Sequence, residues 1–136
     1  MSTEFQLYLA VAVGGALGTM GRYFLSGLVA NTFGGTFPWG TLIINVTGSF
    51  VIGFFAALTG PDGRYMVGST YRQFVMVGLC GGYTTFSSFS LQTLNLVNDG
   101  EWLSAGWNVV GSVVLCLLVV WIGWVLGLAL NQLKGA

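Results

Sequence analysis

The sequence predicts an all-α integral membrane protein with four transmembrane helices. Of its 136 residues, 54% are hydrophobic and only 6% are charged, and the mean hydropathy is +0.81. A soluble domain would carry roughly a quarter charged residues. The few charges mostly separate apolar stretches, and each stretch is long enough to cross a bilayer, which takes about 20 residues. The formal net charge is zero, so the charge balance gives no sign of a nucleic-acid partner.

We expect one membrane domain over residues 1–136. Its four spans are predicted at about 5–28, 39–60, 73–97 and 102–130. The sequence has no histidine, and no carboxylate falls within a span. The chain is therefore not expected to be an enzyme or a proton-coupled transporter.

An even number of spans places both ends of the chain on one side of the membrane. The basic residues on that side are Arg64, Arg72 and Lys134, and the other side has at most Arg22. This is a thin bias for the positive-inside rule. We therefore hypothesise that the chain inserts in both orientations, as a dual-topology protein.

The first span is rich in glycine. Gly14, Gly15, Gly18 and Gly21 lie along it, and such spacing predicts a close helix–helix contact, because association in lipid depends on packing. Arg22 follows directly. Its guanidinium reaches the headgroups, pairs with backbone carbonyls or lines a vestibule that attracts anions, and the residues alone leave these alternatives open.

The second span begins after Pro38 and ends at Gly60-Pro61, which are typical helix boundary residues. One face of it carries polar or small residues at helical spacing, namely Thr41, Asn45, Gly48 and Ser49. An amide in the membrane needs partners. Asn45 therefore either links two helices or serves as a donor on an ion path.

The third span does not have the composition of a lipid-facing helix, because glycines and hydroxyl side chains occupy its middle, from Gly78 to Ser90. We expect a helix broken at mid-membrane, with a first half ending near Cys80, a break at Gly81-Gly82, and Thr84 or Thr85 as the N-cap of the second half. The first half then ends in free carbonyls that suit a cation. The second half begins with free N–H groups that suit an anion.

Phenyl rings and hydroxyls share one face of the second half-helix. Phe86, Phe89 and Ser90 are at i, i+3 and i+4, and Ser87 lies one turn before Ser90. The edge of a phenyl ring is positive, so ring edges can replace part of the solvation of an anion without a fixed charge. The alternative is ordinary aromatic packing between helices.

The fourth span has a polar face and a second glycine pair. Asn108, Ser112 and Cys116 recur every four residues, and Gly123 and Gly127 predict another close helix contact. The sequence has two cysteines, Cys80 and Cys116, and both fall in apolar spans without metal-ligand spacing. We interpret them as small buried hydrophobic residues.

Three motifs resemble the Fluc family of fluoride channels, also called CrcB proteins. They are the decapeptide Gly81–Ser90, the segment Gly40–Phe50 and the pair Gly18-x-x-x-Arg22. The resemblance covers the whole chain in length, span count and motif order. The polar face of the fourth span departs from it, because more hydroxyl or tyrosine character is expected there.

The resemblance implies an antiparallel homodimer with two fluoride pores. It implies that Phe86 and Phe89 form an aromatic box and that Asn45 hydrogen-bonds into it. It also implies that the backbone carbonyls of Gly81 and Thr84 hold a structural sodium ion at the dimer two-fold. Arg22 would line the vestibule. The candidates for a polar track beside the pore are Thr41, Ser87, Ser88, Ser90, Asn108 and Ser112.

These expectations describe a passive fluoride-selective channel that exports fluoride across the cytoplasmic membrane of a bacterial cell, with membrane lipid around it. A small multidrug exporter is a four-span alternative, but it needs a carboxylate inside the membrane. Glu4, the one acid near the first span, precedes the apolar run. A membrane assembly subunit without transport is the other alternative, and in it the polar faces would only join helices.

Overall fold

The computed structural model of the protein describes residues 1–133, and every element in that range is helical. Lys134, one of the basic residues used for the topology hypothesis, lies outside the described residues. The elements in chain order are α1 (Thr3–Phe33), α2 (Trp39–Leu58), α3 (Ser69–Gln73), the π-helical η1 (Phe74–Cys80), α4 (Gly81–Tyr83), α5 (Phe86–Asn98) and α6 (Trp102–Gln132).

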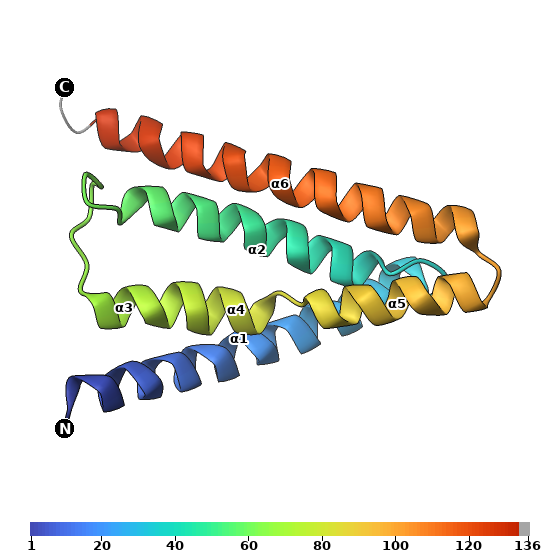
Figure 1. Ribbon diagram of the computed structural model, residues 1–136, viewed down its shortest axis with the longest axis horizontal. Coiled ribbons are helices and arrows are strands. Elements are labelled where there is room, and N and C mark those ends of the chain that lie inside the picture. Colours follow the sequence, from blue (N-terminus) through green and yellow to red (C-terminus); the bar gives the residue numbers. More distant parts are fainter. Residues whose placement is uncertain (134–136) are drawn as a thin grey trace.

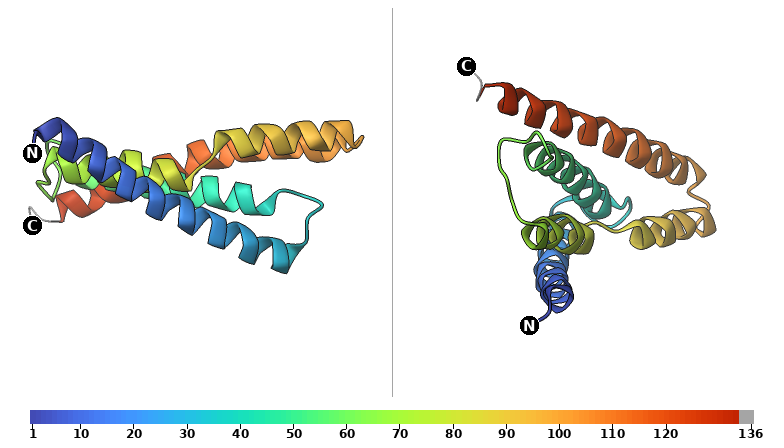
Figure 2. Two further views of the ribbon diagram at one scale, coloured as in Figure 1. Left: turned by 90° about the horizontal axis from the view of Figure 1, so that it is seen from below. Right: turned by 60° about the vertical axis from the view of Figure 1, so that its left-hand side comes forward.

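The helices α3, η1 and α4 follow one another without a gap and form one rod, residues 69–83. In Figure 1 the rod lies between α2 and α1, and α6 covers the other side of α2. The helix α5 leaves the rod and packs on α6, away from α1, as both views in Figure 2 show. The helix α1 begins and α6 ends at the same end of the molecule (Figure 1).

Three of the described helical segments are long and apolar enough to cross a membrane by length and composition: Trp39–Leu58, Ser69–Asn98 and Trp102–Gln132. The helix α1 is long enough, but its glycines and Arg22 lower its hydropathy. Its assignment as the first span stays a prediction.

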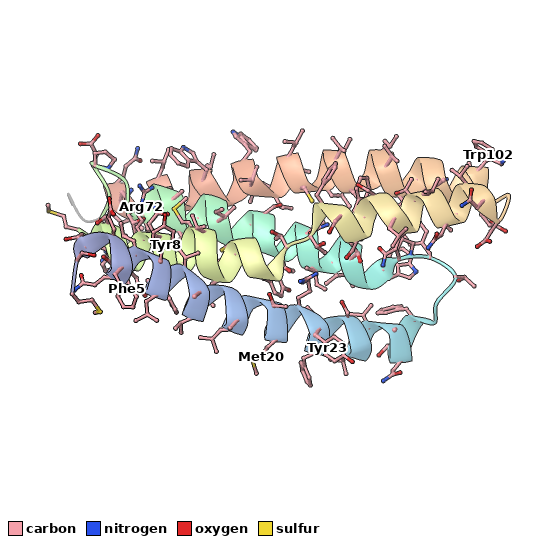
Figure 3. All side chains as sticks on the ribbon, turned by 60° about the horizontal axis from the view of Figure 1, so that its bottom comes forward. Phe5, Tyr8, Met20, Tyr23, Arg72 and Trp102 are labelled. Carbon is pink, nitrogen blue, oxygen red and sulfur yellow. The ribbon has the colours of Figure 1, made fainter. Side chains whose placement is uncertain are left out.

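The outer face of α1 is apolar and exposed. Phe5, Tyr8, Met20 and Tyr23 are 54%, 77%, 67% and 84% exposed, and Figure 3 shows them along the outside of the helix. Large apolar residues are exposed on the other helices as well, including Trp102 at the far end of the molecule. So much contiguous apolar surface requires lipid or a protein partner to cover it.

Glycines bring α1 into backbone contact with the rod. A Cβ atom on Gly14 would lie 2.5 Å from the carbonyl oxygen of Phe74, and one on Gly82 would lie 2.5 Å from the carbonyl oxygen of Gly15. Gly18 is buried, and a Cβ atom on it would overlap the carbonyl oxygen of Leu79. The close contact predicted from these glycines is confirmed.

A second glycine contact joins α2 and α6. Gly123 and Gly127 of α6 are buried against the backbone of Phe50 and Phe54, and a Cβ atom on Gly127 would lie 2.9 Å from the Phe54 carbonyl oxygen. Gly53 of α2 meets α6 in the same way. The predicted small-residue contact of the fourth span is confirmed.

Two expected boundaries shift in the structure. The first span, expected to end at about residue 28, continues as helix to Phe33, and the Thr32 hydroxyl donates to the Leu28 carbonyl at 2.9 Å within this last part. Gly34 then ends α1 with a positive φ of 78°, a conformation that glycine adopts without steric cost. The helix α2 ends at Leu58, shortly before the expected Gly60-Pro61.

Candidate functional site

A cavity of about 400 Å³ lies where the rod gives way to α5. It is bounded by α2, the rod, α5 and α6. Its lining has no charged side chain and consists of Asn45, Gly48, Ser49, Ile52, Met76, Cys80, Gly81, Thr84, Thr85, Phe86, Phe89, Ser112, Val113, Cys116 and Leu117. Residues singled out on three of the predicted spans therefore meet in one place.

The helix stops at Tyr83, not near Cys80 as expected. Thr84 and Thr85 are extended (φ −82°, ψ 158° and φ −153°, ψ 113°), and α5 starts at Phe86. Of the two candidate N-caps, the structure selects Thr85, whose Oγ1 accepts from the Ser88 N–H at 3.2 Å. Gly81 and Gly82 stay helical, and Gly82 serves close packing on α1 instead of breaking the helix.

The carboxamide of Asn45 satisfies both backbone groups of Thr85. The Thr85 N–H donates to Asn45 Oδ1 at 2.8 Å, and Asn45 Nδ2 donates to the Thr85 carbonyl oxygen at 3.0 Å. Asn45 therefore links α2 to the residue that has left the helix.

This arrangement releases two backbone carbonyls on the cavity wall. In a continuous helix the Thr85 N–H would bond to the Gly81 carbonyl, and the Ser88 N–H would bond to the Thr84 carbonyl. Here the first N–H donates to Asn45 and the second to Thr85 Oγ1. Gly81 and Thr84 both line the cavity, and neither carbonyl keeps its helical N–H donor.

The two phenyl rings of α5 are neighbours on this cavity. The ring centroids of Phe86 and Phe89 lie 5.2 Å apart with an interplanar angle of 48°. Their surroundings differ, because Phe89 is 8% exposed and Phe86 is 75% exposed. The tilted pair lines the same cavity as Asn45 and Thr85.

Comparison with known proteins identifies the family. Residues 9–124 match the profile of the family described as CrcB-like protein, Camphor Resistance (CrcB). The chain belongs to the CrcB family. A fluoride-specific ion channel FluC from Opitutus terrae is 65% identical over 130 residues, which cover 96% of this chain and 98% of the relative.

Two further CrcB relatives are similar over most of the chain. The fluoride-specific ion channel FluC of Methylocella silvestris is 60% identical over 95% of this chain and 98% of its own length. That of Rhodospirillum rubrum is 62% identical over 92% of this chain and 97% of its own length. The resemblance found in the motifs is thereby confirmed, and this CrcB protein is an integral membrane protein.

The residues of the predicted polar track do not all line the same cavity in this CrcB protein. Ser112 lines the cavity, together with Cys116. Thr41 is buried and lines a second cavity, of about 430 Å³, between the α1–α2 connection and the end of α5. Ser87 lies near Thr85 on the exposed side of α5 (3.2 Å between hydroxyls).

Two other α5 serines are held by their own helix. Ser88 accepts from the Thr85 hydroxyl at 3.1 Å, and Ser90 donates to the Phe86 carbonyl at 2.9 Å. Neither lines the first cavity.

Asn108 is buried between α5 and α6 and does not line the first cavity, so its place in the pore stays a prediction. It is 1% exposed, its Nδ2 donates to Thr93 Oγ1 at 2.9 Å, and its Oδ1 accepts from the Ser112 hydroxyl at 3.5 Å. Thr93 in turn donates to the Phe89 carbonyl at 2.7 Å. Sequence reasoning missed Thr93, although its i+4 spacing from Phe89 placed it one turn below the second ring.

Arg22 does not line the first cavity. Its Nε donates to the Gly82 carbonyl at 3.2 Å, which is the backbone pairing that the sequence left open as one of three alternatives. A vestibule role stays a prediction.

Proposed function

We propose that the chain is a passive, fluoride-selective ion channel that exports fluoride across the cytoplasmic membrane. The support comes from CrcB family membership, from relatives that carry the name fluoride-specific ion channel, and from the cavity at the helix interruption. The proposal makes the protein a transporter and not an enzyme.

The observation that carries the proposal is the Phe86–Phe89 ring pair beside the Asn45–Thr85 pair in a cavity without charged lining. Fluoride is small and strongly hydrated, so removing its water is costly unless donors replace it. Hydroxyls, the amide of Asn45 and ring edges can do so stepwise. Without a fixed positive charge the ion is not held so tightly that it cannot leave, which conduction requires.

We further propose that two copies run antiparallel in a dual-topology homodimer with two pores. Phe86 supports this, because a phenyl ring that is 75% exposed at the cavity would be covered by a second copy. The apolar outer surface of the helices offers area for such an interface and for lipid. The interruption at Thr84–Thr85 would then lie at mid-membrane, where unsatisfied backbone groups are tolerated only in protein or a cavity.

A structural sodium ion at the two-fold axis completes the proposal. The donor set fits this ion, because Gly81 and Thr84 present carbonyls whose helical N–H donors are engaged elsewhere. Sodium is a hard cation that prefers such oxygen ligands. The ion would supply positive charge to the carbonyl end of the first half-helix.

The test is fluoride efflux from liposomes that contain the purified protein, measured with a fluoride electrode, with chloride as the control ion. We expect rapid fluoride efflux and no comparable chloride efflux. Exchange of protons for an organic cation without fluoride flux would instead support a multidrug exporter. A folded protein without any ion flux would support the assembly-subunit alternative.

A further inference from the structure

The Gly82 carbonyl lies at the end of the rod, and its helical partner in a continuous helix would be the N–H of Phe86, beyond the interruption. Two side chains of α1 donate to it instead. Thr19 Oγ1 lies 3.3 Å away and Arg22 Nε lies 3.2 Å away. Three of the four carbonyls whose helical N–H donors lie at or beyond the interruption thereby fall into two groups. Gly82 is satisfied by α1, and Gly81 and Thr84 remain beside the cavity.

The glycine contact explains how α1 reaches this carbonyl. Gly18 touches the backbone of Leu79 and Tyr83, and Arg22 is one turn further along the same face of α1. A larger residue at position 18 would move α1 away from the rod and take the guanidinium out of hydrogen-bonding range. The motif Gly18-x-x-x-Arg22 thus combines close packing with an external helix cap.

We infer that Arg22 is a positioning residue for the cation site. Together with Thr19 it caps the rod from α1, fixes the interruption, and keeps the carbonyls of Gly81 and Thr84 directed to the cavity. The inference rests on the sodium site of the proposed function. It differs from a vestibule role, because Arg22 then acts through the backbone of Gly82 and not on the anion.

Charge and hydrogen bonding make opposite predictions for Arg22. A guanidinium close to a bound cation repels it, so electrostatics alone predicts that removing the charge strengthens sodium binding. The positioning role predicts weaker sodium binding when the donor is lost. The sign of the change therefore separates the two explanations.

Two substitutions of Arg22 isolate the donor from the charge. Glutamine places its amide Nε2 the same number of bonds from the backbone as arginine Nε, so Arg22→Gln keeps a donor and loses the charge. Arg22→Met has a methyl group at that place and loses both. Arg72→Met is the matched control. Arg72 lies in α3, at the other end of the rod, and its Nε donates to Thr59 Oγ1 at 3.1 Å.

The measurement is the thermal unfolding midpoint of the detergent-solubilised protein as sodium chloride replaces choline chloride at constant ionic strength. Wild type, Arg22→Gln and Arg72→Met should give the same apparent sodium dissociation constant when the gain in stability is fitted to RT ln(1 + [Na⁺]/Kd). Arg22→Met should need about tenfold more sodium, or about 1.4 kcal/mol of binding free energy. Unchanged or tighter sodium binding in Arg22→Met overturns the positioning role while leaving the sodium site intact.

A second variant keeps the inference testable if Arg22→Met does not fold. Thr19→Val removes one of the two donors to Gly82, and we expect a shift in the same direction by about twofold to threefold. Thr32→Val is its control, because Thr32 bonds only within α1. If Thr19→Val matches Thr32→Val, external capping by α1 is rejected. If the unfolding midpoint of the wild-type protein does not change with sodium concentration, the sodium site itself is rejected, and this inference is rejected with it.

Discussion

Asn45 and Thr85, forty positions apart in the chain, form a reciprocal hydrogen-bonded pair. The side-chain amide offers a donor and an acceptor side by side, as an adjacent strand would. It therefore satisfies both the N–H and the carbonyl of Thr85, neither of which forms a helical hydrogen bond at the interruption. Because the bond also diverts the Thr85 N–H from Gly81, the same contact connects the second helix, the interruption and the proposed cation ligands.

Replacement of Asn45 by leucine should damage both stability and transport. Both backbone groups of Thr85 would lose their partners, which we expect to lower the free energy of unfolding by about 2 kcal/mol or more. Fluoride efflux should fall by about tenfold or more. Asn31→Leu, at an exposed position near the end of α1, is the control and should change neither measurement. Wild-type efflux in Asn45→Leu would contradict the role given to the pair.

The aromatic pair is tested by removing one ring at a time. Phe86→Ile and Phe89→Ile keep apolar bulk but lose the ring edge, so fluoride efflux from liposomes should fall by about tenfold or more while the proposed dimer remains assembled. Phe89→Ile should also lower the unfolding midpoint, because Phe89 is buried and Phe86 is not.

A ring pair elsewhere supplies the control for these variants. Phe50 and Phe54 of α2 stack with centroids 6.0 Å apart and do not line the cavity. Phe50→Ile should leave fluoride efflux unchanged. The aromatic role would be abandoned if Phe86→Ile and Phe89→Ile both conducted as well as Phe50→Ile.

Gly81 and Gly82 allow a direct test of packing against helix breaking. A Cβ atom on Gly82 would meet the Gly15 carbonyl at 2.5 Å, whereas one on Gly81 has its nearest neighbour at 3.9 Å. Gly82→Ala should therefore destabilise by about 2 kcal/mol or more. Gly81→Ala should fold normally, since alanine is about 1 kcal/mol better in a helix. Equal effects of the two substitutions on the unfolding midpoint would mean that packing on α1 is not the reason for Gly82.

The sequence was sufficient for the helices and for the close glycine contacts. Apolar runs bounded by residues such as Pro38 predict helices directly, and the spacing of Gly14 and Gly18 predicts a seam whatever lies opposite. It was not sufficient to locate the interruption. A pair of glycines reads as a helix break or as a packing surface, and only the position of α1 against Gly82 decides between them.

The partners of the polar residues were also beyond the sequence. The sequence marks Asn45 as an unusual residue within a span, but a contact across forty positions has no local signal. Arg22 had three possible environments, and the choice depended on how closely Gly18 lets α1 approach the rod. The sequence gives no signal for Thr93, because a single threonine in a helix is common and its hydrogen bond with Asn108 is visible only in the folded structure.

The Asn108–Thr93 contact suggests that Asn108 holds α5 on α6 and does not line a pore. Thr93→Val leaves the buried Asn108 amide without its acceptor, which should cost about 1–3 kcal/mol. Asn108→Leu should cost a similar amount. The double variant should cost less than the sum of the two by about 1 kcal/mol, because an apolar pair leaves neither partner of the Asn108–Thr93 bond unsatisfied, although the Ser112 hydroxyl still loses Asn108 Oδ1 as its acceptor.

Transport separates this packing role from a pore role. Neither side chain lines the first cavity, so fluoride efflux in Thr93→Val and in the double variant should stay within about threefold of wild type, measured at a temperature where both are folded. Ser112→Ala provides the contrast, because Ser112 does line the cavity and its loss should reduce efflux further. The packing role would be wrong if the stable double variant lost most of its fluoride efflux and if the changes in unfolding free energy of the two single variants simply added. Asn108 would then be a pore residue.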